Sequence, residues 1–304
     1  MVSKREKCFH IIWFLSCFNW KQNSQNRDGS CLCSIHCLDT NGVDMSEETL
    51  SLIWSRRTIR DFERREIEKE TVDKLKAMTL RAPSAGNMEM YSILEVEDKE
   101  KKKQLAVICD NQKMIENAPL VWIFLCDMEK WKRYFTFSKS PEKFNIPMPK
   151  LGAGDMLLSF EDAVIAAENS VIAAEALGLG SCYIGDVLEN GEKLVELFSL
   201  PKHVIPAAMV IYGYPKSKER FQSTPRPDIN SSIFMKDRYK ERTFEDLEDE
   251  YKGHREYNKE HKRLPFNGEG TVADEYYGRK YTSEFMAEMN RSALYYIGRY
   301  LEKE

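Results

Sequence analysis

The first candidate site is a cluster of positive charge. The segment "RRTIRDF", residues 56–62, places three arginines within five positions, and the segment "APSAGN", residues 82–87, follows after one helix length. Arginine forks bind phosphate oxygens bidentately, and the hydroxyl of Thr58 can donate to the same group. A Ser-Ala-Gly turn lets backbone N–H groups approach a ligand, and the amide of Asn87 can both donate and accept. These residue types suit a phosphorylated, polar-edged ring such as flavin mononucleotide (FMN).

The bulk composition restricts what else the arginines could bind. The chain has 304 residues, of which 42% are hydrophobic and 31% charged, the balance of a folded globular protein. A formal net charge of −4 argues against a general nucleic-acid-binding field, so the cluster indicates a local anionic ligand. Charge alone leaves a second interpretation open, which is a solvated helix face.

Motifs for the common side-chain chemistries are missing after residue 45. The histidines there, His203, His254 and His261, stand in no Ser-His or Cys-His signature, and neither G-x-S-x-G nor a P-loop occurs. The segments "GAGDML" and "GLGSCYIG" fail as dinucleotide fingerprints because neither follows a clear strand. A protein without side-chain catalysts can take its chemistry from a bound cofactor.

Residues 1–44 differ from the rest of the chain. Their apolar stretch, residues 8–18, is shorter than the ~20 residues of a membrane span and lacks the small-residue cleavage site of a signal peptide. The segment "CLCSIHC", residues 31–37, has neither zinc nor iron–sulfur spacing, so we expect no metal there. Because Met45 opens a segment with the pattern of a capped helix, we expect residues 1–44 to be a leader, disordered or outside the native fold.

The later cysteines indicate the compartment. Cys109, Cys126 and Cys182 lie in mostly apolar segments, which is typical of buried, reduced thiols and not of a disulfide framework. The sequence therefore predicts a cytoplasmic protein. Neither a nucleic acid nor a membrane is expected as a partner.

Hydrophobic periodicity predicts the elements that position these residues. The segment at 159–180 is the strongest helix and is apolar nearly all round, so it must be buried on several sides. Residues 128–160 are irregular, which predicts either a lid or an ordinary surface loop. In the last helix Phe285, Met289, Ile297 and Leu301 recur at helical spacing and predict docking through that face. Helices are also expected at 47–57, 69–81 and from 282 onward, strands at 91–96, 120–126 and 207–215, and a short segment at 181–185.

With these features in order, the chain resembles the nitroreductase family of FMN-dependent oxidoreductases. "RRTIRDF" is similar to the family's Arg-Arg-Ser-x-Arg-x-Phe motif and "APSAGN" to its Pro-Ser-x-x-Asn loop. "NQKMIENAP", "EALGLGSCYIG" and "IYGYP" followed by "TPRPD" are similar to its later segments. The resemblance covers about residues 49–228. It implies an α+β, three-layer fold with a central mixed, mainly antiparallel sheet flanked by helices, in an intertwined homodimer.

The resemblance also implies roles for the arginine segment. Arg56, Arg57 and Thr58 would hold the FMN phosphate and ribityl chain, and Arg226 would complete the phosphate clamp. Arg60 would lie near the pyrimidine edge of the flavin ring. There it would stabilise the negative charge that develops at flavin N1 and O2 on reduction, which is electrostatic support and not acid–base catalysis.

A second group of matched residues would surround the ring. Pro83, Ser84 and Asn87 would contact the FMN bound mainly by the other subunit, because each of the family's two FMN sites lies at the dimer interface. Asn111 or Gln112 would approach the ring edge.

The resemblance implies that Gly185 would supply backbone near flavin N5. The implied reaction is ping-pong: NADH or NADPH delivers hydride to the flavin and leaves, and a nitroaromatic or quinone-like acceptor then enters. Two departures stand out. Glu89 puts negative charge where the family loop usually has an amide, and Thr224 stands where some members carry a second basic phosphate ligand.

The expected organisation is a leader at 1–44, an FMN-binding domain at 45–239 and a C-terminal helical extension at 240–304, docked on the domain or on the partner subunit. Two other functions remain open. One is a flavin-dependent reductive dehalogenase of the deiodinase type, whose lid clamps an amino-acid zwitterion with Glu, Tyr and Lys; Glu129 and Tyr134 do not match its spacing. The other is a non-catalytic flavin-binding protein. The physiological acceptor and the choice between NADH and NADPH stay undetermined.

Overall fold

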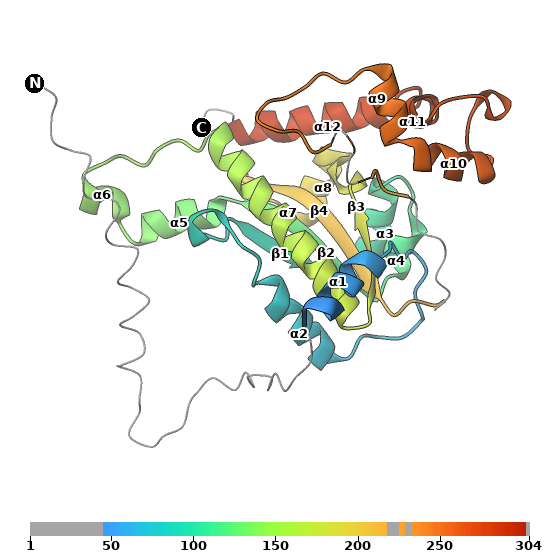
Figure 1. The fold of residues 1–304 in the computed structure, drawn as a ribbon. Helices are drawn as coiled ribbons and strands as arrows, with labels where there is room; N and C mark the ends of the chain where they lie inside the picture. The colour runs from blue at the N-terminus through green and yellow to red at the C-terminus, as the bar shows by residue number, and fades with distance from the viewer. Residues whose placement is uncertain (1–44, 218–224, 229–230, 232, 302–304) are drawn as a thin grey trace, which may run out of the picture. The chain divides into compact units, whose positions relative to one another are not determined.

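The computed structural model describes residues 45–217, 225–228, 231 and 233–301 (Figure 1). The expected leader at 1–44 and the departure at Thr224 lie outside the described residues. The chain divides into a unit at Met1–Glu48 and a compact unit at Thr49–Glu304. The first unit supplies only the described start of helix α1 (Met45–Ser55), and every other described element belongs to the second.

A four-stranded antiparallel sheet lies at the centre of the second unit (Figure 1). In the order β1-β2-β4-β3, β2 pairs Leu120 with Tyr212 of β4, and β3 pairs Gly180 with Gly213. Because β2 and β4 are central and covered on both faces, their sequences are apolar throughout and do not alternate with polar residues. The strands are β1 (Tyr91–Glu95), β2 (Leu120–Asp127), β3 (Gly180–Ile184) and β4 (Val204–Gly213).

Helices cover both faces of the sheet. Alternate residues of β2 point to opposite sides, so that Trp122 and Phe124 join one core, and Val121 and Ile123 join the other. The first core lies under α2 (Lys69–Thr79) and α7 (Ala153–Ala176), and the second under α3 (Lys99–Ile108), α4 (Lys113–Asn117) and α8 (Gly191–Phe198).

Further elements complete the described part of the chain. They are η1 (Ala85–Asn87), α5 (Glu129–Phe137), α6 (Ser140–Phe144), η2 (Asp186–Leu188), α9 (Phe244–Glu250), α10 (Lys252–Glu260), η3 (Phe266–Gly268), α11 (Val272–Lys280) and α12 (Glu284–Leu301). None of the helices in the described ranges is long and apolar enough to cross a membrane.

The expected α+β architecture with a mainly antiparallel sheet is confirmed, whereas three local predictions need correction. The short segment at 181–185 is a full strand, β3, and the strong helix begins at Ala153 and ends at Ala176. The irregular stretch after residue 128 contains α5 and α6. In α5 the aromatic side chain of Trp131 packs inward and donates its Nε1–H to the carbonyl of Met88 at 2.8 Å, which gives the helix an anchor that periodicity does not show.

The last helix docks, but through a different face from the one expected. Ile297 and Leu301 are 37% and 42% exposed, while Tyr296 and Tyr300 are buried. The reason is the close approach of α8: a Cβ on Gly191 would lie 3.0 Å from the Tyr296 ring, so this glycine makes room for the aromatic face.

A buried serine holds this docking in place. The Oγ of Ser292 accepts a hydrogen bond from the N–H of Gly191 at 2.9 Å and donates to the carbonyl of Leu188 at 2.6 Å. The extension is thereby tied to the loop after β3, which the sequence analysis places near the flavin.

Replacing that hydroxyl should loosen the extension. Ser292→Ala leaves a buried N–H and a buried carbonyl without partners, so we expect the free energy of unfolding to fall by about 1–3 kcal/mol. Ser283→Ala is the control, because the exposed Ser283, between α11 and α12, bonds to the nearby carbonyls of Arg279 and Lys280. Equal denaturation midpoints for both variants in urea would contradict the assigned role.

Candidate functional site

The arginine segment runs along the edge of the sheet. Thr58 forms a parallel bridge with Ser181 of β3, and the N–H of Ile59 donates to the Ser181 carbonyl at 2.8 Å. Further along, the N–H of Glu63 donates to the carbonyl of Tyr214 at 2.8 Å. The segment therefore extends the sheet beyond β3, and this pairing fixes the position of each arginine along the edge of the sheet.

Two glycines let the segment approach so closely. A Cβ on Gly180 would lie 2.7 Å from Ile59, and a Cβ on Gly213 would lie 2.8 Å from the ring of Phe62. Ile59 and Phe62 pack against the second core, whereas Arg60 is exposed.

Arg56 and Arg57 share a carboxylate at the C-terminal end of α7. Burial raises the pKa of Glu175, and the charges of Arg56 and Arg57 oppose that shift. Arg57 and Glu175 also line a cavity of about 360 Å³ together with Arg65. An anion binding in this cavity would meet two guanidinium groups, Arg57 and Arg65, and two carboxylates, Glu63 and Glu175.

A buried aspartate shapes the Pro83–Asn87 loop. The carboxylate of Asp162 in α7 accepts hydrogen bonds from the N–H of Ala85 at 2.8 Å and from the N–H of Met90 at 3.0 Å. Asp162 is only 1% exposed, so these charge-assisted bonds form away from water. They hold the turn in which Asn87, at φ +55°, takes the left-handed conformation and stays exposed.

A third group gathers at the end of β3. The side-chain amide of Gln112 donates to Asp186 at 2.6 Å, which places the loop after α3 beside Gly185. Burial raises the pKa of the Cys182 thiol, and the guanidinium of Arg60 opposes the shift through its charge and a hydrogen bond to the sulfur. Gly185 is exposed, and nothing lies within 4 Å of the position of a Cβ there. Open space therefore adjoins this corner of the site.

Arg226 lies in a different environment. It lines a cavity of about 360 Å³ with Asp249 and Glu256 of the extension, and its charge adds to the effect of burial in lowering the pKa of His254. Within the described part of the chain its contacts are with α9 and α10, not with the arginine cluster. Its role in a phosphate clamp stays a prediction.

The predicted residues thus form groups that a single chain does not bring together. Asp162, which holds the Pro83–Asn87 loop, and Glu175, which faces Arg56 and Arg57, are separated by more than three turns of α7, about 20 Å along its axis. The Arg60 and Gln112 groups adjoin through Cys182 and Asp186. The group around Arg56 and the Pro83–Asn87 loop are held near the C-terminal end and near the middle of α7, respectively.

Sequence reasoning missed the acidic residues that organise these groups. Asp162, Glu175 and Asp186 carry no motif of their own, and neighbouring acids at Glu161 and Glu168 are exposed. One feature of the sequence could have indicated the role of Asp162. It lies on the alanine-rich face of α7, where a buried charge is costly unless it has hydrogen-bond partners.

Comparison with known proteins gives the family. The model of the nitroreductase family matches residues 53–214, more than half of the chain, and the chain belongs to this family. It is 32% identical over 168 residues to an FMN reductase (NADPH) of Bacillus subtilis, covering 55% of this chain and 66% of the relative. It is 29% identical over 168 residues to an oxygen-insensitive NADPH nitroreductase of Salmonella typhimurium, covering 55% and 65%. The chain therefore spans about two thirds of the length of these relatives.

Solved structures extend the likeness to the fold. Nitroreductase A from Vibrio parahaemolyticus is 25% identical with a TM-score of 0.68, covering 84% of this chain and 98% of that chain. NfrA2 of B. megaterium is 27% identical with a TM-score of 0.65, covering 81% and 97%. The expected nitroreductase-like fold is confirmed.

Removing the Asp162 carboxylate should release the loop. Asp162→Ala breaks two charge-assisted hydrogen bonds and leaves the N–H of Met90 buried, so we expect a loss of about 2–4 kcal/mol in the free energy of unfolding. Glu161→Ala, at an exposed neighbouring position, should stay within about 0.5 kcal/mol of the unchanged protein. Chemical denaturation measures both, and a small effect at Asp162 would show that the loop holds itself.

Proposed function

We propose that the chain is an FMN-dependent NAD(P)H oxidoreductase that reduces nitroaromatic or quinone-like acceptors by ping-pong hydride transfer. The observation that carries the proposal is the corner where Arg60, Gln112 and Gly185 adjoin beside open space. A cation, an amide and an accessible backbone are the groups that a flavin ring edge requires. The names of the relatives support the same cofactor and electron donor.

The residues present fit FMN. Arg56, Arg57 and Thr58 would hold the phosphate and ribityl chain, and binding there would replace the carboxylate of Glu175 as the partner of the arginines. Bound FMN would supply the hydride chemistry, taking hydride from the nicotinamide and passing it to the acceptor. The guanidinium of Arg60 would stabilise negative charge at the pyrimidine edge of the ring, and Asp186 would orient the Gln112 amide.

We also propose that the active form is a homodimer with two FMN sites. In one chain the Pro83–Asn87 loop lies about 20 Å along α7 from the Arg56 group, so its expected contact with FMN requires a second copy. Exposed apolar side chains on two helices supply a surface for that copy. They are Ile53 and Trp54 of α1, 54% and 92% exposed, and Leu157 and Ile165 of α7, 59% and 40% exposed. Three buried free thiols at Cys109, Cys126 and Cys182 support a cytoplasmic location.

The dehalogenase interpretation has no support from the candidate lid. Glu129 is paired with His203 at 3.0 Å, and Lys130 donates to the carbonyl of Tyr91 at 2.5 Å. Both charges already have partners within the chain. A zwitterion clamp would have to break both contacts.

Turnover tests the proposal directly. The purified protein should carry FMN and oxidise NADH or NADPH in the presence of a quinone or nitroaromatic acceptor, with parallel double-reciprocal plots. Bound FMN without steady-state turnover would favour the non-catalytic flavoprotein, and absence of FMN would refute the cofactor proposal.

Arg56 and Arg60 should separate in their effects on the flavin potential. The charge of the phosphate near Arg56 does not change on reduction. Arg56→Ala should therefore weaken the binding of oxidised and reduced FMN alike, by roughly tenfold to a hundredfold. Charge near Arg60 appears only on reduction, so Arg60→Ala should lower the midpoint potential, by ~30 mV for each 1.4 kcal/mol of lost stabilisation. Spectroelectrochemistry of bound FMN measures both. The same potential in Arg60→Ala, Arg56→Ala and the unchanged protein would make Arg60 an anchor only.

A further inference from the structure

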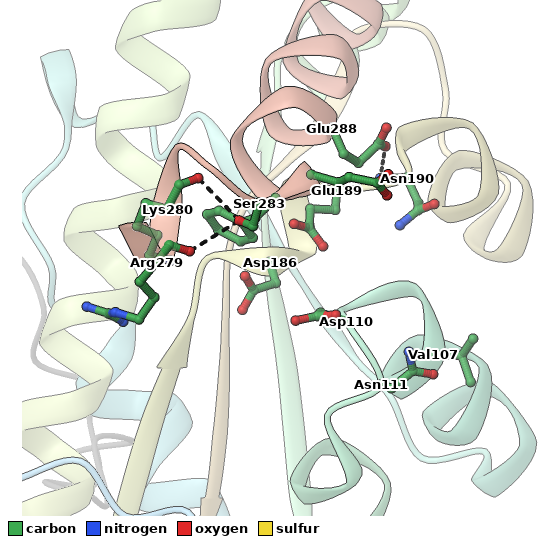
Figure 2. A pocket seen from close by; sticks show the side chains of 12 residues that line it. Val107, Asp110, Asn111, Asp186, Glu189, Asn190, Arg279, Lys280, Ser283 and Glu288 are labelled. Atoms are coloured by element: carbon green, nitrogen blue, oxygen red, sulfur yellow. Dashed lines mark hydrogen bonds between the residues drawn. The ribbon is translucent and has the colours of Figure 1, made fainter. Parts of the chain in front are cut away.

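A third cavity, of about 650 Å³, lies beside the corner of the candidate site (Figure 2). Its walls come from three parts of the chain that are far apart in sequence. Val107 and Asp110 stand at the end of α3, Asp186 and Glu189 follow β3, and Phe285 stands at the start of α12. The C-terminal extension therefore closes one side of a space that the sheet and its loops open on the other.

Five of the twelve residues that line the cavity are acids, and several of its charged residues already have partners. Glu288 is paired with Arg291 at 2.7 Å and accepts the N–H of Asn190 at 3.0 Å. Arg279 is paired with Glu275 at 3.0 Å, and Lys280 lies over the ring of Phe285, 3.7 Å from its centroid. After these pairings, the negative charges of the acids near Glu189 dominate the electrostatics of the cavity.

Glu189 is the unusual member of this set. It is only 5% exposed, and its carboxylate points into the cavity, toward Asp186 and Asp110 (Figure 2). Among the residues that the structure describes, no hydrogen-bond donor or ion-pair cation contacts this carboxylate. Burial, together with the charges of Asp186, Asp110 and Glu288, raises the pKa of Glu189 to about 7, while the charge of Lys280 opposes the shift.

The Glu189 side chain is largely buried and its carboxylate opens onto the cavity, where a charge without a partner is less well solvated than at the surface. Here the neighbouring acids increase the cost, so the position favours either a bound proton or a bound cation. No group of three or more His, Cys, Asp or Glu in the described ranges could hold a metal ion. The apolar side chains of Val107 and Phe285 instead provide walls for the body of an organic molecule.

We propose that this cavity binds a small organic monocation, an aromatic amidinium or ammonium, with Glu189 as its buried counter-ion. The carboxylate would accept hydrogen bonds from the cationic head, and Phe285 and Val107 would contact its apolar body. Asp186, which also holds Gln112, would connect this ligand to the corner of the candidate site. The inference rests on the cavity itself and does not need the proposed oxidoreductase activity.

The test uses three probes of nearly the same shape and different charge. Benzamidine is the cation, benzamide the neutral analogue and benzoate the anion, each titrated calorimetrically into the purified full chain at pH 8. We expect benzamidine to bind at least tenfold more tightly than the other two. Benzamidine that binds no better than benzamide would overturn the proposal, because Glu189 would then contribute nothing to recognition.

A pair of variants locates the effect. Glu189→Gln keeps the size of the side chain and removes its charge. This variant should bind benzamidine at least tenfold more weakly than the unchanged protein. Glu284→Gln removes an exposed charge from the rim of the same cavity and should change the affinity less than about threefold. Equal losses in the two variants would indicate general attraction by the acidic surface and would refute the assigned counter-ion.

The pH dependence decides the matter if Glu189→Gln does not fold. As the pH falls from 8 to 5.5, Glu189 takes up a proton and loses its charge, among facing groups Asp186, Asp110, Glu288 and Lys280. Benzamidine stays cationic over this range, so its affinity for the unchanged protein should fall at least fivefold. An affinity that does not change with pH would overturn the proposal.

Discussion

The helix α7 sets the geometry on which the candidate cofactor site depends. Its 24 residues form a rigid rod across one face of the sheet, and its middle and its C-terminal end hold different parts of the site. Near the middle, Asp162 fixes the Pro83–Asn87 loop, and at the C-terminal end Glu175 faces Arg56 and Arg57. The separation of about 20 Å between the two parts is the reason for proposing that each site is divided between two copies.

Buried carboxylates organise the molecule at several points. Asp162 is satisfied by two backbone N–H groups, Glu175 has two arginines nearby, and Asp186 holds Gln112. In each case the acid positions a segment that carries binding residues. Glu189 is more buried than the half-buried Glu175 and Asp186 but has no such partner, and this contrast is the reason for assigning it a ligand.

The sequence was sufficient for the elements with strong periodicity or strong motifs. The apolar runs of β2 and β4 and the helical pattern of α2 predicted those elements within a few residues, because burial on one or two faces leaves a regular pattern. The helix α7 was predicted at 159–180 and spans Ala153–Ala176. The prediction of which face of α12 docks was wrong, because Tyr296 and Tyr300 pack beside Gly191 of α8. The local sequence of α12 contains no information about a glycine on another helix. The roles of Asp162 and Glu189 were missed for the same reason: their partners, or the lack of them, are set by contacts far away in the sequence.

Subunit mixing tests the divided site most directly. One chain would carry Arg56→Ala and Arg60→Ala, the other Ser84→Ala and Asn87→Ala, and two different affinity tags would isolate the mixed dimer. Each variant alone should bind little FMN. If each site takes arginines from one copy and the loop from the other, the mixed dimer has one intact site and should bind half the FMN of the unchanged dimer. A mixed dimer that binds no FMN would show that each site is built within one chain, and would contradict the account.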